Sequence, residues 1–179
     1  IVEIGAVPVP VDIGKDHLMN YDLLEKNITT KTKAIMPTQL NGRTCNMDKI
    51  YNIAKKFDLM IFEDAAQGLG SKFKGKNAGT FGIASAVSFY PAKNLGCLGD
   101  GGAILLNDEN LYNKIIAYRD HGRDPNTGTV ISWGVNSRLD NLQASFLNYF
   151  LNNYSNVIER RRFIADSYCQ LLGNVDEID

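Results

Sequence analysis

The fold is decided by residues 47–67, which read Met-Asp-Lys-Ile-Tyr-Asn-Ile-Ala-Lys-Lys-Phe-Asp-Leu-Met-Ile-Phe-Glu-Asp-Ala-Ala-Gln. Apolar residues at helical spacing predict a helix over 47–57: Met47, Ile50, Tyr51, Ala54 and Phe57. The run Leu59–Phe62 that follows has the length of a buried strand, and it ends at two carboxylates, Glu63 and Asp64. A helix that leads directly into a buried strand is typical of an α/β domain.

The same alternation extends on both sides of this stretch. Further strands are predicted at 7–13, 34–36, 84–90 and 102–106, and further helices at 21–28, 109–119, 139–150 and 155–172. Pro8 and Pro10 predict an edge position or a strand end for the first strand, and Asn20 is the expected N-cap of the helix at 21–28. We therefore predict an α/β fold with a mostly parallel sheet flanked by helices. The irregular, glycine-bearing stretch 121–137 is expected to be a functional loop.

The composition excludes several classes of protein. With 19 basic and 20 acidic residues the net charge is −1, which gives no electrostatic footprint for nucleic acid or for an anionic membrane surface. No apolar run approaches the length of a membrane span, and the start at Ile1 has no signal-peptide features, so we expect a cytoplasmic protein. The cysteines lie far apart and the histidines lack metal-ligand spacing, so neither a disulfide framework nor a metal site is expected.

Polar clusters follow the predicted strand ends, where ligands bind in parallel α/β sheets. The clusters are Glu63–Gln67, Ser88–Asn94 and the glycine-rich Gly96–Gly102. Between the last two lies Lys93, whose amine, if desolvated, would be a nucleophile toward carbonyl groups. Asp64 could keep a ring nitrogen protonated, which makes the ring the electron sink that pyridoxal phosphate (PLP) chemistry requires. Gln67 could contact the ring hydroxyl, and Ser88 could donate to the phosphate.

Each of these residues also has an ordinary interpretation that spacing alone leaves open. A single Asp after a strand usually caps a turn, and a single Lys in a loop is usually solvated. The basic triplet Arg160–Arg162 is typical of a solvated helix face. Other chemistries lack their motifs: the sequence contains no Walker P-loop and no G-x-S-x-G, and the G-x-G-x-x-G that begins at Gly68 fails at Phe73.

Four blocks carry a resemblance to a known family: Glu63–Gln67, Ser88–Gly96, Gly99–Ala103 and Asn136–Ala144. In this order they resemble the DegT/StrS family of sugar aminotransferases, which are fold-type I PLP enzymes. The resemblance covers nearly the whole chain and implies the large domain of a fold-type I PLP transferase. Ala92 and Cys97 depart from the residues common in the family, which are Thr and Ala.

The resemblance implies a role for each matching position. Lys93 would form the imine with PLP and then move the proton during turnover. Asp64 would pair with the pyridinium nitrogen, Gln67 would contact the region of the ring hydroxyl, and Ser88 would bind the cofactor phosphate. Asn136 would reach the cofactor phosphate of a partner subunit, so a homodimer is expected. Related sugar dehydratases carry histidine in place of this lysine, and Lys93 therefore favours transamination.

The resemblance also implies a domain plan and a substrate class. Family members are about twice as long, so we expect residues 1–152 to be the PLP-binding domain and 153–179 to begin a connecting helix. The N-terminal part and the small C-terminal domain would then lie outside this sequence, and the chain alone would be inactive. The expected substrates are a nucleotide-linked keto-sugar with glutamate as amino donor. Residues 36–43, 120–124 and 132–134 are similar to the branch that aminates 8-oxo-octulosonate for lipopolysaccharide.

Two alternatives remain open at this point. The chain could be a non-catalytic fragment or binding module with the same fold, or it could be a dehydratase that uses the pyridoxamine form of the cofactor (PMP). Lys93 argues against the dehydratase.

Overall fold

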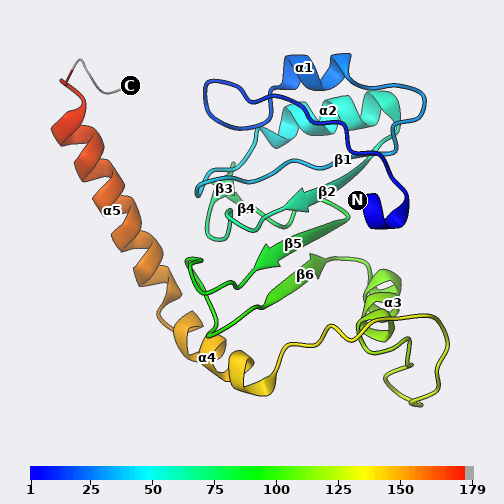
Figure 1. Cartoon of the computed structure of the whole chain (residues 1–179). Coiled ribbons are helices and arrows are strands. Elements are labelled where there is room, and N and C mark those ends of the chain that lie inside the picture. Colours follow the sequence, from blue (N-terminus) through cyan, green and yellow to red (C-terminus); the bar gives the residue numbers. More distant parts are fainter. Residues whose placement is uncertain (176–179) are drawn as a thin grey trace. The chain divides into compact units, whose positions relative to one another are not determined.

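A computed structural model describes residues 1–175 and contains a four-stranded sheet of mixed direction (Figure 1). Its strands, in spatial order, are β1 (Ala34–Ile35), β2 (Met60–Asp64), β5 (Ala84–Ser88) and β6 (Gly102–Leu106). β1, β2 and β5 run parallel, and β6 pairs antiparallel with β5. The α/β fold is confirmed, with an antiparallel strand at one edge of the sheet.

The chain divides into two compact units. The first comprises Ile1–Ser88 and Gly102–Arg138, and the second comprises Phe89–Gly101 and the chain from Leu139 onward. Beside the sheet, the first unit holds η1 (Val2–Ile4), α1 (Tyr21–Lys26), α2 (Met47–Phe57), the hairpin β3 (Lys72–Phe73) and β4 (Lys76–Asn77), and α3 (Glu109–Arg119). The second unit holds α4 (Asn141–Leu151) and α5 (Tyr154–Leu172). The division into domains 1–152 and 153–179 stays a prediction.

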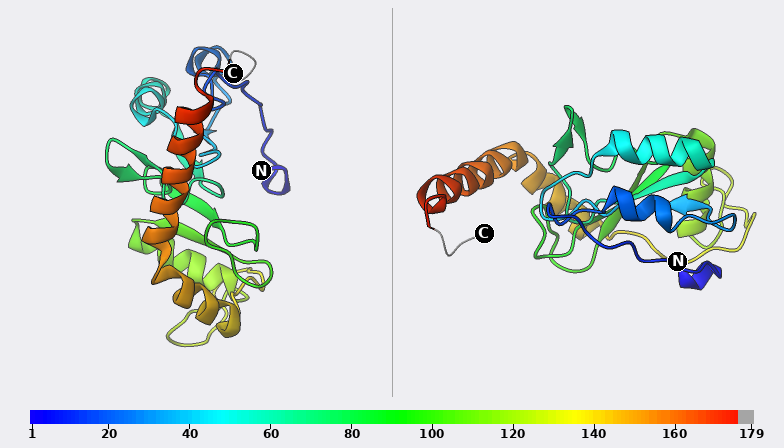
Figure 2. Two further views of the ribbon diagram at one scale, coloured as in Figure 1. Left: turned by 90° about the vertical axis from the view of Figure 1, so that its left-hand side faces the viewer. Right: turned by 90° about the horizontal axis from the view of Figure 1, so that it is seen from above.

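One face of the sheet is packed against α1 and α2, which lie side by side (Figures 1 and 2). The apolar face of α2 supplies the centre of the core: Met47, Ile50, Ile53 and Ala54 are all buried. The helix begins where the Asn46 side chain accepts a hydrogen bond from the Lys49 N–H, at 3.2 Å. Ile35 of β1 and Ile61 of β2 complete this layer. On the opposite face of the sheet, Ile104 of β6 is 53% exposed.

The predicted strand at 7–13 is wrong. Residues 6–12 have no regular structure, and only Ile13 forms an isolated antiparallel bridge, with Met19. Pro8 and Pro10 have no N–H to donate to a ladder, and the segment is exposed, so nothing drives it into the sheet. The strand predicted to reach residue 90 ends at Ser88, because the Phe89 N–H turns to the carbonyl of Gly101, at 2.8 Å.

Within residues 1–175, none of the helices is both long enough and apolar enough to cross a membrane.

Candidate active site

Asp64 and Ser88 meet on one face of the sheet, at the carboxyl ends of neighbouring parallel strands. Asp64 is paired with Ala86, and Ser88 lies two residues further along β5. Alternate residues of a strand share a face, so Asp64, Ala86 and Ser88 project to the same side. Thr38 joins this row through a parallel bridge to Asp64. The structure therefore brings two of the predicted site residues together.

The backbone of Asp64 is fixed by the chain that continues β1. Its N–H donates to the carbonyl of Pro37 at 3.0 Å, and its carbonyl accepts from the N–H of Gln39 at 2.8 Å. The half-buried carboxylate accepts a hydrogen bond from the Ala66 N–H at 3.1 Å. Asp64 thus caps the following turn, as an ordinary aspartate at this position would. A functional role in addition to this cap stays a prediction.

Gln67 lies in the turn that follows β2, and its side chain is exposed. Its carbonyl accepts a hydrogen bond from the Gly42 N–H at 2.9 Å. The next residue, Gly68, packs so closely on Gln39 that a Cβ atom at Gly68 would lie 2.5 Å from the Cβ of Gln39. This close approach requires glycine at position 68, and the contact with Gln39 holds the turn in place.

Lys93 lies in the loop Phe89–Gly101, which belongs to the second unit. The lysine is half-buried, and its N–H donates to the carbonyl of Tyr90 at 2.8 Å. Buried Cys97 organises the loop, since its Sγ lies 3.0 Å from the carbonyl oxygens of both Phe89 and Gly99. Because Lys93 and Asp64 belong to different units, their convergence on one pocket stays a prediction.

Tyr154, at the start of α5, contacts this loop and was not identified from the sequence. Burial raises the pKa of its hydroxyl, and the charge of Arg161 and a hydrogen bond with the Asn94 side chain oppose the rise. Asn94 follows Lys93 directly, so the tyrosine anchors the residue next to the predicted catalytic lysine. A tyrosine at the start of a helix that the sequence predicts to be partly exposed carries no signal for such a contact.

Asn136 is exposed at the end of a loop that is more regular than its sequence predicts. It forms an antiparallel bridge with Asp120, and Arg138 forms an ion pair with Asp120 at 2.9 Å. A second bridge joins Arg123 and Val130. Among the apolar side chains that the loop displays is Trp133, which is 96% exposed.

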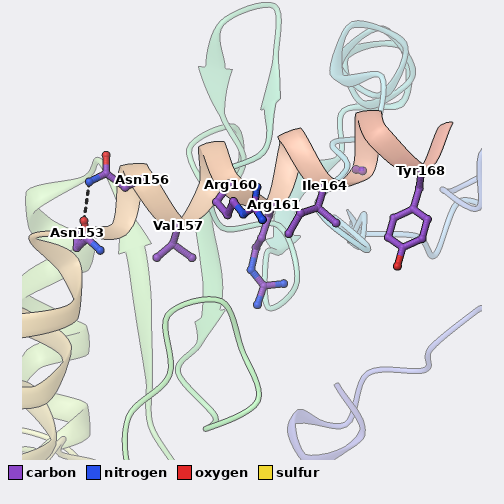
Figure 3. A pocket seen from close by; sticks show the side chains of 8 residues that line it. Asn153, Asn156, Val157, Arg160, Arg161, Ile164 and Tyr168 are labelled. Carbon is purple, nitrogen blue, oxygen red and sulfur yellow. Dashed lines mark hydrogen bonds between the residues drawn. The ribbon is translucent and has the colours of Figure 1, made fainter. Parts of the chain in front are cut away.

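A groove runs along α5, and none of the predicted site residues belongs to its lining (Figure 3). Its lining comes from α5 and the residue before it: Asn153, Asn156, Val157, Arg160, Arg161, Ile164, Ala165 and Tyr168. Among the residues that the structure describes, the lining comes from this one stretch of chain, which is not the enclosed shape of a typical cofactor site. Arg160 and Arg161 are exposed there, in keeping with the solvated helix face predicted for the basic triplet.

The sequence matches the DegT/DnrJ/EryC1/StrS aminotransferase family over residues 1–179. A UDP-2-acetamido-2-deoxy-3-oxo-D-glucuronate aminotransferase from Pseudomonas aeruginosa is 42% identical over 166 residues, which make up 92% of this chain and 46% of that protein. The chain spans about half the length of the curated relatives it matches.

Solved structures show the same fold. A DegT/DnrJ/EryC1/StrS aminotransferase from Brucella abortus superposes with a TM-score of 0.92 at 38% identity, over 97% of this chain and 49% of that one. An Escherichia coli GDP-4-keto-6-deoxy-D-mannose-3-dehydratase with bound hydrated PLP has a TM-score of 0.85 at 25% identity, over 92% of this chain and 47% of that one. Both transaminases and dehydratases therefore share this architecture.

Proposed function

Because the chain belongs to the DegT/DnrJ/EryC1/StrS aminotransferase family, we propose that the protein is a PLP-dependent aminotransferase that moves an amino group from an amino acid to a keto-sugar. The observation that carries the proposal is the shared face of Asp64 and Ser88 at the carboxyl ends of β2 and β5. The loop that bears Lys93 begins directly after Ser88. A carboxylate, a hydroxyl and an amine are the groups that a phosphorylated pyridine aldehyde needs.

Each of the predicted site residues would bind a different group of this cofactor. The Asp64 carboxylate, fixed at its backbone from both sides, would hold a proton at the ring nitrogen. The Ser88 hydroxyl would donate to the phosphate, and the exposed Gln67 amide would contact the ring hydroxyl region. Lys93 would bind the cofactor covalently and carry the proton between the reacting carbons. When bound, the cofactor supplies the electron sink for amino-group transfer.

The substrate is proposed as a nucleotide-linked keto-sugar, with glutamate as the amino donor. The Pseudomonas relative acts, by its name, on a UDP-linked 3-oxo sugar, which supports this class. The second proposed substrate is 8-oxo-octulosonate, because residues 36–43, 120–124 and 132–134 resemble the branch of the family that aminates this sugar. In the first case the product would serve surface-polysaccharide synthesis, and in the second lipopolysaccharide synthesis.

The dehydratase and the non-catalytic module are the competing functions. Lys93 provides the amine that transamination requires, and the similarity to the aminotransferase, at 42% identity, exceeds that to the dehydratase, at 25%. We further propose a cytoplasmic homodimer in which Asn136 reaches the partner's cofactor phosphate. The exposed apolar side chains of its loop, Trp133 above all, support an interface there.

The test is to assay the intact protein with PLP, glutamate and a panel of keto-sugars, reading 2-oxoglutarate. We expect turnover with one sugar, and we expect Lys93→Ala to lose both turnover and the visible absorbance of bound cofactor. The exposed Lys76→Ala is the matched control and should keep both. If cofactor absorbance survives in Lys93→Ala, the covalent link lies elsewhere and the assignment fails. Sugar-dependent loss of water without 2-oxoglutarate would favour the dehydratase.

A further inference from the structure

Glu63 is a buried carboxylate for which the proposed chemistry has no use. Glu63 is 1% exposed, and its side chain accepts five hydrogen bonds from other parts of the protein. On Oε1 the donors are the N–H groups of Phe81 (2.5 Å) and Gly82 (2.9 Å) and the hydroxyl of Ser85 (3.0 Å). On Oε2 they are the N–H of Gly79 (2.8 Å) and the side-chain amide of Gln39 (2.9 Å). All partners donate, so a carboxylate satisfies them and an amide in its place could not.

Gln39 connects this carboxylate to the predicted site. Its side chain is fully buried, and while Nε2 donates to Glu63, Oε1 accepts from the Cys45 N–H at 2.8 Å. Its own backbone N–H donates to the carbonyl of Asp64. Gly68, in the turn that carries Gln67, packs on its Cβ. A single residue thus contacts the buried anion and the turn beyond β2 through its side chain, and the end of β2 through its backbone.

The pleat of β2 explains why this arrangement bears on Asp64. Glu63 and Asp64 are consecutive strand residues, so their side chains project to opposite faces. Five donors fix Glu63 on the covered face, and rotation of the strand end about its own axis would break these hydrogen bonds. Asp64 is held on the other face, beside Ser88. A buried charge that is fully hydrogen-bonded is costly to disturb.

We propose that Glu63, held by Gln39, is a positioning residue that directs the Asp64 carboxylate at the cofactor ring nitrogen without touching the cofactor. The inference rests on the proposed function. The variants that test it are Glu63→Gln alone and with Gln39→Glu in the intact protein. In the single variant an amide must face N–H donors. In the double variant, the carboxylate introduced at position 39 can accept from both the Cys45 N–H and the amide at position 63, so part of the network returns.

The measurements are the pH dependence of the visible absorbance of bound PLP and the PLP dissociation constant. If Asp64 is misaligned, the ring loses part of its positive charge, so the cofactor's link to the lysine keeps its proton to a higher pH. We expect Glu63→Gln to raise the midpoint by about one pH unit and the dissociation constant about tenfold. The double variant should recover part of both changes. If Glu63→Gln does not fold, Gln39→Met removes one of the five donors to Glu63, together with the acceptor of the Cys45 N–H, and should shift both quantities in the same direction by less.

A purely structural role would give a different pattern. Asn46→Ala removes the cap of α2 on the same face of the sheet and should lower the free energy of unfolding without moving the midpoint. If Glu63→Gln behaves like Asn46→Ala, or if the double variant recovers nothing, the positioning role is overturned while the aminotransferase stands. If the wild-type protein shows no cofactor absorbance at all, the proposed function fails, and this inference fails with it.

Discussion

The backbone N–H of Leu98 donates to the side-chain Oε1 of Gln143 at 2.7 Å. The bond ties the loop that bears Lys93 to the first turn of α4 within the second unit. Within the same loop, the buried Cys97 thiol donates a hydrogen bond to a backbone carbonyl, and Tyr154 of α5 contacts Asn94. The predicted catalytic lysine therefore lies in a loop that is fixed by three separate contacts.

Replacing Gln143 with Ala should loosen this loop. One hydrogen bond is lost, which is worth about 1 kcal/mol, so the PLP dissociation constant should rise about fivefold. Amide hydrogen exchange at Leu98 should accelerate in the same variant. Asn148→Ala, which removes an exposed amide from the same helix, is the matched control. Unchanged exchange at Leu98 in Gln143→Ala would show that the bond does not hold the loop.

Gly122→Ala should disrupt the loop that presents Asn136. Gly122 has φ +72°, and a Cβ there would lie 1.8 Å from the carbonyl oxygen of Ser132. Gly128 has φ +70° with nothing within 4 Å, so Gly128→Ala isolates the cost of the backbone conformation, about 1 kcal/mol. We expect Gly122→Ala to lose at least about 2 kcal/mol of unfolding free energy in urea. Fluorescence of Trp133, the single tryptophan, should report the local change. Equal losses in the two variants would contradict this account.

Asp64→Asn should keep the fold and lose the chemistry. Asparagine can still accept the Ala66 N–H, so the turn remains capped, but a neutral amide cannot stabilise a protonated ring nitrogen. Losing one charge-assisted hydrogen bond predicts a fall in kcat of about 10- to 100-fold. Steady-state kinetics with urea unfolding in parallel would separate the two effects. A variant with full activity would remove Asp64 from the site.

The cysteines should differ in reactivity toward an alkylating reagent. Cys169 is exposed, whereas Cys45 and Cys97 are buried, and burial raises the pKa of the Cys45 thiol. Since the thiolate is the nucleophile, Cys169 should react first and Cys45 only on unfolding. Because the folded pKa of Cys45 lies above the unfolded one, its contribution to stability is complete below the unfolded pKa. That contribution is lost as the pH rises through the folded value. Mass spectrometry after timed alkylation checks the order of reaction, and urea unfolding at neutral and alkaline pH checks the loss of stability.

The sequence by itself determined the elements whose signals are local. The bounds of α2, α3 and β6 agree with those predicted, since helical periodicity, a preceding cap residue and a short apolar run between glycines and a turn all act over a few residues. The order of the polar blocks also sufficed to indicate the family. Asp64 and Ser88 could be predicted to approach each other because parallel strands end at the same edge.

The tertiary structure decided what depends on partners far away in the chain. Residues 7–13 look like a strand but join no sheet, and only Ile13 forms an isolated bridge. β6 pairs antiparallel with β5, which could not be predicted because pairing direction has no local signature in the sequence. Glu63 and Gln39 are 24 positions apart, so nothing in the strand-end motif shows that one carboxylate is buried as an anchor and its neighbour projects to the opposite face. Which of two adjacent acidic residues faces the core is set by the pleat and by the donors that the fold brings to one side of it.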